Sequence, residues 1–339
     1  MKKRKFNIRF FNHIKMNKDT VTKVCNSSDF YYQEKFKNEI EWLVAAQKII
    51  PYCVPKVIDY STNKNNLFVK YVKIQKDTIH DCLISKEKIN WTKLVKVLKK
   101  HFNKCQKISP TDKEILKDKW QLKIKKFYID RTISQIDRLE KEVKVTKNNK
   151  NLIFFTNEFI YINNKKYPSL KTIRDFLNKQ KKKQTGIFKD LIQLEKNRIC
   201  FSHLDMVFSN MFLDTKNQLK LIDARGSFDT SKKYGDKYYD YAKIWQCING
   251  LYDFIIEDEF YLQVNKNKVN YKIKSPKLSK YKKEIIKTFP KSKTNIIFLI
   301  EALQFLNMPP YHKDKPRRQT VMICTGITHF CDLVKETWK

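Results

Sequence analysis

The sequence predicts an α+β fold, in which a small lobe of antiparallel strands with one helix precedes a larger, mainly helical lobe. Two patterns predict this order. The first seventy residues contain β-branched, alternating segments on either side of one long helical pattern. From about residue 89 onward, apolar residues recur mostly at helical spacing. With 339 residues, 41% of them hydrophobic, the chain can bury a sizeable core in one large or two modest domains.

The predicted small lobe covers residues 1–75. Residues 20–24 alternate and are mostly β-branched, which predicts a strand. A polar turn then leads into a helix, whose apolar residues repeat at helical spacing until Pro51 stops it. Residues 57–60 and 67–72 are two more strand patterns around a polar turn and predict a hairpin. The expected order is therefore strand, helix, strand and strand.

The predicted large lobe covers residues 76–339. Its apolar residues mark amphipathic helices, one of which runs over residues 120–143. Residues 139–190 are expected to form an insertion of helix and hairpin. Within it, the apolar residues 153–155 and 159–162 predict the two strands of the hairpin. The last fifty residues return to helical spacing, so the lobe is expected to end in helices.

The charge balance bears on possible partners. Lys and Arg number 71 against 35 Asp and Glu, a formal net charge of +36. Only nine of the 71 are Arg, the residue preferred for bidentate contacts to phosphate and guanine. We therefore expect salt-dependent, non-specific attraction of polyanions and no specific nucleic acid. A polyanion-binding protein stays open as an alternative, because residues 266–293 are lysine-rich, with Tyr271, Tyr281 and Phe289 interleaved.

Cysteine usage and hydropathy predict a cytoplasmic protein. The eight cysteines are scattered without a C-x-x-C pair, as expected for reduced core residues. No apolar stretch approaches the ~20 residues that a membrane-spanning helix needs, so no membrane insertion is expected. The basic start, residues 1–5, is not followed by an apolar segment, so the sequence predicts no secretory signal.

The residues that carry chemistry flank one predicted hairpin. Asp205 and Asn210 precede its first strand, residues 211–213, and Asp223 follows its second strand, residues 219–222. Phosphoryl transfer needs a carboxylate that accepts the proton of the attacking hydroxyl, and oxygen ligands that hold Mg²⁺ against nucleotide phosphates. Asp205 fits the first role, and Asn210 and Asp223 fit the second. Because the hairpin returns the chain to one edge, we expect these three side chains to lie together.

These motifs resemble the catalytic core of the kinase-like phosphotransferases, the superfamily of aminoglycoside phosphotransferases and choline kinases. The resemblance rests on H-x-D-x-x-x-x-N at residues 203–210, I-D at residues 222–223 and a helix that begins with Asp240-Tyr-Ala. D-x-R-G at residues 223–226 and Y-G-D at residues 234–236 are similar to the phosphotransferase domains of bacterial capsule and surface-polysaccharide biosynthesis proteins. The resemblance implies a protein-kinase-like two-lobed fold, with ATP and Mg²⁺ as cofactors.

The resemblance also implies roles for single residues of the large lobe. Asp205 would be the catalytic base, and Asn210 and Asp223 would bind magnesium. His203 would hold the catalytic loop through hydrogen bonds. Asp240 would support the backbone of that loop from the start of its helix, and it can cap the helix as well.

In the small lobe, the resemblance implies a strand lysine that holds the α- and β-phosphates and a helix glutamate that orients it. Lys23 and Glu39 have the expected element types and order, with Glu34 and Glu41 as competitors for the glutamate. Arg225, in the D-x-R-G motif, either binds a phosphate or anionic substrate or pairs with an acidic neighbour.

Two positions depart from the family pattern. Leu204 replaces the glycine of H-G-D, which changes backbone freedom but no functional group. No glycine precedes Gly186, so the phosphate-covering loop expected near residues 13–19 is not glycine-rich. That absence leaves a pseudokinase as an alternative.

The favoured interpretation is an ATP- and Mg²⁺-dependent kinase that phosphorylates a hydroxyl of a small molecule, such as a sugar or amino-alcohol used in a surface glycan. A protein kinase is a further alternative. Against it, the sequence has no H-R-D, D-F-G or A-P-E motif. The short stretch between Asp223 and Asp240 also leaves too little room for a long activation loop.

Overall fold

The computed structural model divides the chain into two compact units. Unit 1 comprises Met1–Ser109 and Ile199–Asp240, and unit 2 comprises Pro110–Arg198 and Tyr241–Lys339. The structure describes residues 12–146, 149–276 and 278–334, so the basic start of the chain lies outside the described residues. The two units are defined by how densely their residues contact one another. They do not test the predicted lobe boundary at residue 75 or the predicted insertion over residues 139–190, which stay predictions.

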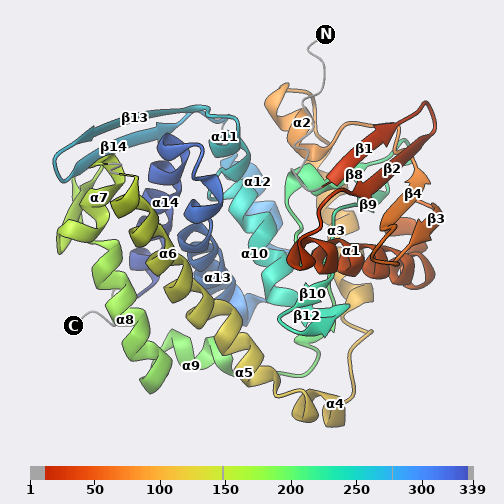
Figure 1. Cartoon of the computed structure of the whole chain (residues 1–339), viewed down its shortest axis with the longest axis horizontal. Helices are drawn as coiled ribbons and strands as arrows, with labels where there is room; N and C mark the ends of the chain where they lie inside the picture. Colours follow the sequence, from red (N-terminus) through yellow and green to blue (C-terminus); the bar gives the residue numbers. More distant parts are fainter. Residues whose placement is uncertain (1–11, 147–148, 277, 335–339) are drawn as a thin grey trace. The chain divides into compact units, whose positions relative to one another are not determined.

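Unit 1 contains a four-stranded antiparallel sheet with the order β1-β2-β4-β3 (Figure 1). Its strands are β1 (Asn12–Met16), β2 (Thr20–Cys25), β3 (Val57–Ser61) and β4 (Phe68–Val72). Alternation buries Val21 and Lys23 of β2 on the same face as Val69 and Tyr71 of β4. The predicted strand and hairpin are confirmed, and β1 is an additional edge strand that the sequence analysis missed.

One long helix, α1 (Phe30–Ile49), packs along this sheet (Figure 1). It begins at Asp29, whose carboxylate accepts the backbone N–H of Tyr31, and it ends before Pro51. The buried residues of the helix are Phe36, Glu39, Ile40, Trp42, Leu43 and Ala46. A buried glutamate within an otherwise apolar row faces the buried Lys23. Buried charges are normally paired, and here the sheet and α1 each supply one partner of the pair.

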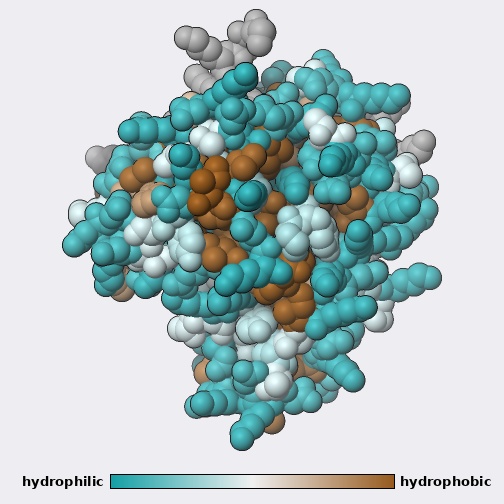
Figure 2. Space-filling model, turned by 90° about the vertical axis from the view of Figure 1, so that its right-hand side faces the viewer, coloured by the Kyte–Doolittle hydropathy of each residue, from teal (hydrophilic) through white to brown (hydrophobic). Residues whose placement is uncertain are grey.

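The outer side of the same unit carries exposed apolar residues. Figure 2 views the side on which β3 lies in Figure 1 and shows hydrophobic side chains gathered near its middle, bordered by hydrophilic ones. Among the described residues of unit 1, exposed large apolar side chains occur on β1, α1, β3 and β4; they are Met16, Phe30, Tyr31, Ile58, Tyr60 and Val72. The sheet thus buries its inner face against α1 and keeps apolar side chains at its surface.

The remainder of unit 1 includes the helices α2 (Ile79–Ile84) and α3 (Trp91–Cys105) and three short strand pairs. The antiparallel pairs are β7 (Ile199–Phe201) with β12 (Tyr234–Asp236), β8 (Met211–Leu213) with β9 (Leu219–Leu221), and β10 (Ser227–Phe228) with β11 (Ser231–Lys232). The β8–β9 hairpin confirms the predicted hairpin between Asn210 and Asp223.

Unit 2 is mainly helical. Its helices include α4 (Asp112–Lys117), α5 (Trp120–Lys125), α6 (Arg131–Val145), α7 (Asn149–Thr156), α8 (Leu170–Lys183), α9 (Ile187–Ile192), α11 (Tyr252–Ile256), α12 (Ser279–Ile286), α13 (Thr294–Asn307) and α14 (Pro316–Val334). A π-helical turn joins α5 to α6, so the predicted helix over residues 120–143 is confirmed as one helical run. Helix α10 (Lys237–Ile248) begins in unit 1 and continues into unit 2.

One prediction within unit 2 is wrong. Residues 153–155 belong to helix α7 and do not form a strand. Instead, β5 (Phe159–Ile162) pairs with β6 (Lys165–Pro168) across Asn163 and Asn164, which both have positive φ. A short apolar run does not distinguish a strand from a buried helix by its periodicity, whereas the two asparagines match the turn of a tight hairpin.

The β5–β6 hairpin belongs to a second four-stranded sheet. A second hairpin, β13 (Phe260–Asn265) and β14 (Lys268–Ile273), pairs with it to give the order β13-β14-β5-β6. The contact between β14 and β5 is parallel and joins residues more than a hundred positions apart. In the part of the chain that the structure describes, no helix is long and apolar enough to cross a membrane.

Candidate active site

Lys23 is the centre of a buried charge cluster in unit 1. Its Nζ donates to Oδ1 of Asp223 at 2.7 Å and to Oε1 of Glu39. Burial by itself lowers the pKa of Lys23, but the charges of Asp223 and Glu39 outweigh it and raise the pKa above its usual value. The lysine is therefore a fixed cation, held between a helix glutamate and the aspartate that follows the β8–β9 hairpin.

The structure distinguishes the three glutamates of α1 that the sequence left open. Glu39 is 6% exposed, and its carboxylate contacts the Lys23 amine. Glu41 lies on another face of the helix, where it accepts from Lys232 at 3.0 Å. Of the three, Glu39 is thus the one that the helix directs at Lys23, and Glu34 is not the partner of the Lys23 ion pair.

The loop after β7 is held by a carboxylate from α10. The backbone N–H groups of His203 and Leu204 donate to Oδ2 and Oδ1 of Asp240 at 2.9 and 2.6 Å. Burial raises the pKa of Asp240 to about 7; the two N–H donors oppose this, and the nearby carboxylates of Asp205 and Asp236 reinforce it. Asp240 lies within the first turn of α10, and both of its carboxylate oxygens accept backbone N–H groups of the loop.

His203 is fixed in one tautomer by its two ring nitrogens. Nδ1 accepts the backbone N–H of Asp205 at 3.2 Å, so Nε2 carries the proton and donates to the Ile222 carbonyl at 2.9 Å. Burial lowers the pKa of His203 to about 4, which keeps the ring neutral at pH 7. His203 therefore joins the start of the loop to the end of the β8–β9 hairpin through hydrogen bonds.

Helix α1 also holds this loop. The indole N–H of Trp42 donates to the Ser202 carbonyl at 2.8 Å. Its ring stacks on Phe201 at 5.3 Å and meets the edge of the His203 ring at 4.9 Å between centroids. The helix that carries Glu39 thus fixes the loop that carries Asp205. Sequence analysis missed Trp42, because an apolar residue on a helix gives no signal of a polar contact to a distant loop.

Asp205 and Asn210 lie at the start of the β8–β9 hairpin. Nδ2 of Asn210 donates to the backbone oxygen of Asp205 at 2.9 Å and lies 3.4 Å from its Oδ2. The backbone oxygen of Asn210 accepts the N–H of Ile222 at 3.1 Å, which places the two ends of the hairpin side by side. With its nitrogen facing Asp205, the side-chain oxygen of Asn210 is the atom that a cation would bind.

The D-x-R-G motif makes the exit of the hairpin turn sharply against α1. Asp223 and Gly226 have φ of 59° and 73°, and the Arg225 N–H donates to the His203 carbonyl at 3.0 Å. A Cβ on Gly226 would lie 2.2 Å from the carbonyl oxygen of Asn38 in α1. Only glycine fits there. The backbone of Arg225 is thus tied to the loop, and its part in phosphate or substrate binding stays a prediction.

Leu204, which replaces the family's glycine, has a φ of 64° and is fully buried. This left-handed conformation costs a non-glycine residue about 1–2 kcal/mol. The side chain fills space that another glycine leaves open, since a Cβ on Gly235 would lie 2.6 Å from Cδ2 of Leu204. The glycine of Y-G-D therefore accommodates the leucine of the loop.

The donor set fits a magnesium ion held together with a nucleotide. Among the described residues, no three His, Cys, Asp or Glu side chains cluster as metal ligands. Asn210 and Asp223 supply one amide and one carboxylate oxygen, and Mg²⁺ commonly takes its other ligands from water and phosphates. The charged Lys23 beside Asp223 suits phosphate oxygens. The chemistry of this donor set is therefore compatible with a magnesium ion that is bound together with phosphate groups.

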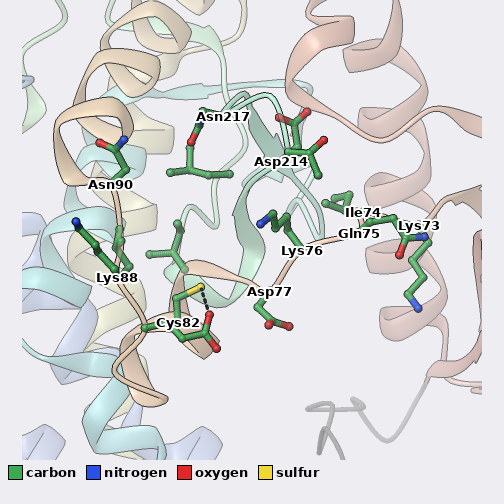
Figure 3. A pocket seen from close by; sticks show the side chains of 15 residues that line it. Lys73, Ile74, Gln75, Lys76, Asp77, Cys82, Lys88, Asn90, Asp214 and Asn217 are labelled. Atoms are coloured by element: carbon green, nitrogen blue, oxygen red, sulfur yellow. Dashed lines mark hydrogen bonds between the residues drawn. The ribbon is translucent and has the colours of Figure 1, made fainter.

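A separate cavity of about 540 Å³ lies elsewhere in unit 1 (Figure 3). It is lined by the segment that follows β4, by the loop before α3 and by the turn of the β8–β9 hairpin. Its lining contains both lysines, such as Lys73, Lys76 and Lys88, and carboxylates, such as Asp77 and Asp214. None of the predicted catalytic, phosphate-binding or metal-binding residues lines this cavity.

Comparison with known proteins supports the fold. No family model and no curated protein sequence matches the chain. Among solved structures, the GDP and kanamycin complex of APH(2")-IIia is similar, with 13% identity, a TM-score of 0.52, and coverage of 98% of this chain and 92% of that one. The streptomycin–ATP–APH(2")-IIa ternary complex is also similar, with 13% identity, a TM-score of 0.49, and coverage of 93% of this chain and 86% of that one. Choline kinase LicA from Streptococcus pneumoniae is similar with 12% identity, a TM-score of 0.46, and coverage of 97% of this chain and 90% of that one.

The similarity to the first of these structures extends over nearly the whole of both chains. At 13% sequence identity, it is evidence for a shared fold. The chain thus has the fold of the kinase-like phosphotransferases, and the predicted fold class is confirmed.

Proposed function

We propose that this protein is an ATP- and Mg²⁺-dependent kinase that transfers a phosphoryl group to a hydroxyl of a small molecule. The observation that carries the proposal is the Glu39–Lys23–Asp223 cluster, because it places a cation that can hold phosphates beside a carboxylate that can hold a metal. The Lys23–Glu39 contact is buried, and the Lys23–Asp223 contact is part-buried. Asp205 and Asn210 lie at the other end of the same hairpin. If these residues were needed only for folding, apolar side chains at the same positions would stabilise the chain as well or better.

In this mechanism each residue has one task. Asp205, held at its backbone by His203 and contacted by Asn210, accepts the proton of the attacking hydroxyl. Lys23 would hold the α- and β-phosphates, and Asn210 and Asp223 would hold Mg²⁺, which supplies charge neutralisation at the phosphate oxygens.

The finer parts of the proposal rest on the sequence motifs. The proposed acceptor is a sugar or amino-alcohol used in surface-glycan biosynthesis, because the D-x-R-G and Y-G-D motifs are similar to phosphotransferase domains of that biosynthesis. Each motif also contains a glycine that packing requires: Gly226 lies against α1, and Gly235 lies against Leu204. We place the activity in the cytoplasm, where ATP is supplied and where free cysteines such as the eight of this chain are usual.

The proposal is tested by measuring ADP release with a panel of sugars and amino-alcohols, using the wild type, Asp205→Asn and Asp59→Asn. Asp59 is an exposed aspartate of β3 and serves as the matched control. We expect acceptor-dependent turnover in the wild type and the control. Asp205→Asn should lose at least about 100-fold in kcat, the usual size of a general-base contribution. Full turnover in Asp205→Asn contradicts the assigned base.

Two other results would favour a different function on the same fold. ATP and Mg²⁺ binding without turnover on any acceptor would favour the pseudokinase. Phosphorylation of a generic protein substrate, with no small-molecule turnover, would favour the protein kinase.

A further inference from the structure

We propose that the outer face of the β13-β14-β5-β6 sheet in unit 2 is a binding surface for single-stranded nucleic acid, used without sequence preference. This outer face is defined by the exposed and half-buried side chains of the four strands that point away from α14. The proposal goes beyond the kinase activity, and its residues lie in a different unit from the charge cluster around Lys23.

The two faces of this sheet have different chemistry. The inner face joins the apolar core of unit 2, where Phe260 packs with Phe305 and Met322 and the Tyr271 hydroxyl lies 3.3 Å from that of Thr325 on α14. Because side chains alternate along a strand, the residues next to these point outward. Figure 1 shows the β13–β14 hairpin lying across the end of this helical region. The outer face is therefore held in place by a packed core beneath it.

Lysines give the outer face its charge. Lys166, Lys268 and Lys272 are all exposed there. The four strands contain no aspartate or glutamate at any position. Elsewhere in the chain, acidic residues form ion pairs with some of the surface lysines and arginines, for example Lys144 with Glu140 and Arg318 with Asp258. A face with several cations and no anions on its strands attracts an anionic polymer.

Aromatic rings lie beside these lysines. Tyr261 is 62% exposed and is directly opposite Lys272 in the β13–β14 register. Tyr161 lies opposite Lys268 on one side and opposite Lys166 on the other. On the same strand, Phe159 is 43% exposed, and the Lys166 amine lies 4.0 Å from its ring centroid. Phe159 thus has a lysine amine at its ring, and Tyr161 and Tyr261 each lie opposite a lysine in the strand register.

Two amides complete the surface. Gln263 and Asn270 are both exposed and oppose each other between the two aromatic ends of the face. Rings that stack on bases and amines that neutralise phosphates are the features with which proteins hold single strands, and every base offers a face to stack. The exposed side chains that we assign to this face are rings, amines and amides. A lipid surface would instead favour a broad apolar face that inserts into the membrane boundary, and amides such as Gln263 and Asn270 interrupt such a face here.

This assignment differs from the aromatic residues that the sequence analysis weighed for a polyanion site. Phe289 is buried against Trp245, with ring centroids 5.8 Å apart, and the Tyr271 hydroxyl meets Thr325 on the inner side of the sheet. Neither ring is available for stacking. The outer face instead carries the exposed rings of Phe159 and Tyr261 and the half-buried ring of Tyr161, none of which belongs to the aromatic set that the sequence analysis weighed.

The test measures binding of a fluorescently labelled twelve-nucleotide oligothymidine by anisotropy, with no ATP present. Tyr261→Ala should weaken binding at least about five-fold, the lower limit for loss of one base–aromatic stack. Tyr261→Phe keeps the ring and should bind like the wild type. Tyr311→Ala is the matched control, since Tyr311 is a half-exposed tyrosine of unit 2 outside the sheet, and it should also bind like the wild type.

A second set of variants tests the charge. Replacing Lys166, Lys268 and Lys272 together by alanine should reduce the slope of log affinity against log salt by about 2, at about 0.7 per phosphate contact of a single strand. Alanine at the exposed Lys113, Lys117 and Lys141 removes the same charge elsewhere in unit 2 and should change the slope much less.

The probes themselves separate the sources of binding. An abasic oligomer with the same phosphates should bind the wild type at least about five-fold more weakly than oligothymidine, and Tyr261→Ala should make that difference smaller. The proposal is overturned if the abasic oligomer or heparin binds as tightly as oligothymidine, or if Tyr261→Ala and Tyr311→Ala lose binding equally. Binding to phosphatidylserine vesicles that is lost with the three sheet lysines but unaffected by oligothymidine would also overturn it.

Discussion

The buried carboxylate of Asp240 makes the stability of this protein depend on pH in a defined direction. In the folded protein, its pKa is raised from the usual 3.8 to about 7, chiefly by burial. The folded state therefore holds a proton that the unfolded chain has released, over the window from about pH 4 to pH 7. The contribution of this group to stability is present at low pH and is lost as the pH rises through 7.

Asp240→Asn removes this titration. A raised pKa of about three units corresponds to about 4 kcal/mol over the full window, of which about 3 kcal/mol falls between pH 5 and pH 8. The asparagine accepts from only one of the two N–H groups, of His203 and Leu204, that now bond to the carboxylate. That loss costs about 1–3 kcal/mol at every pH. The free energy of unfolding of the variant should therefore be lowest relative to that of the wild type at pH 5. Between pH 5 and pH 8, the difference should shift by about 3 kcal/mol in favour of the variant.

The measurement is urea denaturation of the wild type, Asp240→Asn and the control Asp59→Asn at pH 5, 6, 7 and 8. Buried His203 and His101, whose pKa values fall to about 4 and about 3, change stability in the opposite sense, since they lose stability as the pH falls. They are present in all three proteins, so the difference between proteins isolates Asp240. A difference between Asp240→Asn and wild type that stays constant from pH 5 to pH 8 would refute this account.

Three more predictions follow from the charge cluster and its surroundings. Gly226→Ala should lower the free energy of unfolding by at least about 2 kcal/mol, measured by urea denaturation, because its Cβ would meet the Asn38 carbonyl at a positive φ. Lys23→Met should cost about 3–5 kcal/mol by leaving Glu39 buried without its cation, and Lys23→Met combined with Glu39→Leu should recover much of that loss. If the double variant is no more stable than Lys23→Met, the pair is not coupled. Mg²⁺ alone should leave the melting temperature unchanged, whereas Mg²⁺-ATP at ~100 times its dissociation constant should add about 2.7 kcal/mol, an effect that Asp223→Ala removes. A shift with Mg²⁺ alone would contradict a site that needs phosphate to complete it.

The sequence by itself determined the local parts of this protein. The β8–β9 hairpin between Asn210 and Asp223 follows from two short apolar segments around a polar turn, and both strands are where the pattern places them. Helix α1 follows from helical spacing and from Pro51, which ends it. The hairpin and the helix depend on residues that are close together in the chain, so the local sequence is enough to specify them.

The tertiary structure decided the contacts between distant residues. Lys23 meets Asp223 across 200 positions, and Glu39 meets Lys23 because the rotation of α1 directs that residue, and not Glu41, at the sheet. Trp42 reaches the loop that carries Asp205 for the same reason. Among 71 basic residues, the pattern alone cannot show which lysine is buried beside which carboxylate. Packing determines this, because a buried charge is stable only beside its partner.

Packing also decided the conformation of short segments. Residues 153–155 are apolar and fit a strand or a helix equally by pattern, and their place in unit 2 made them helical. The parallel pairing of β14 with β5 joins two hairpins that lie far apart in the chain, and it alone creates the outer face on which Tyr161 and Tyr261 stand among lysines. Pairing of this kind depends on the whole fold, since no local propensity encodes the register of two distant strands.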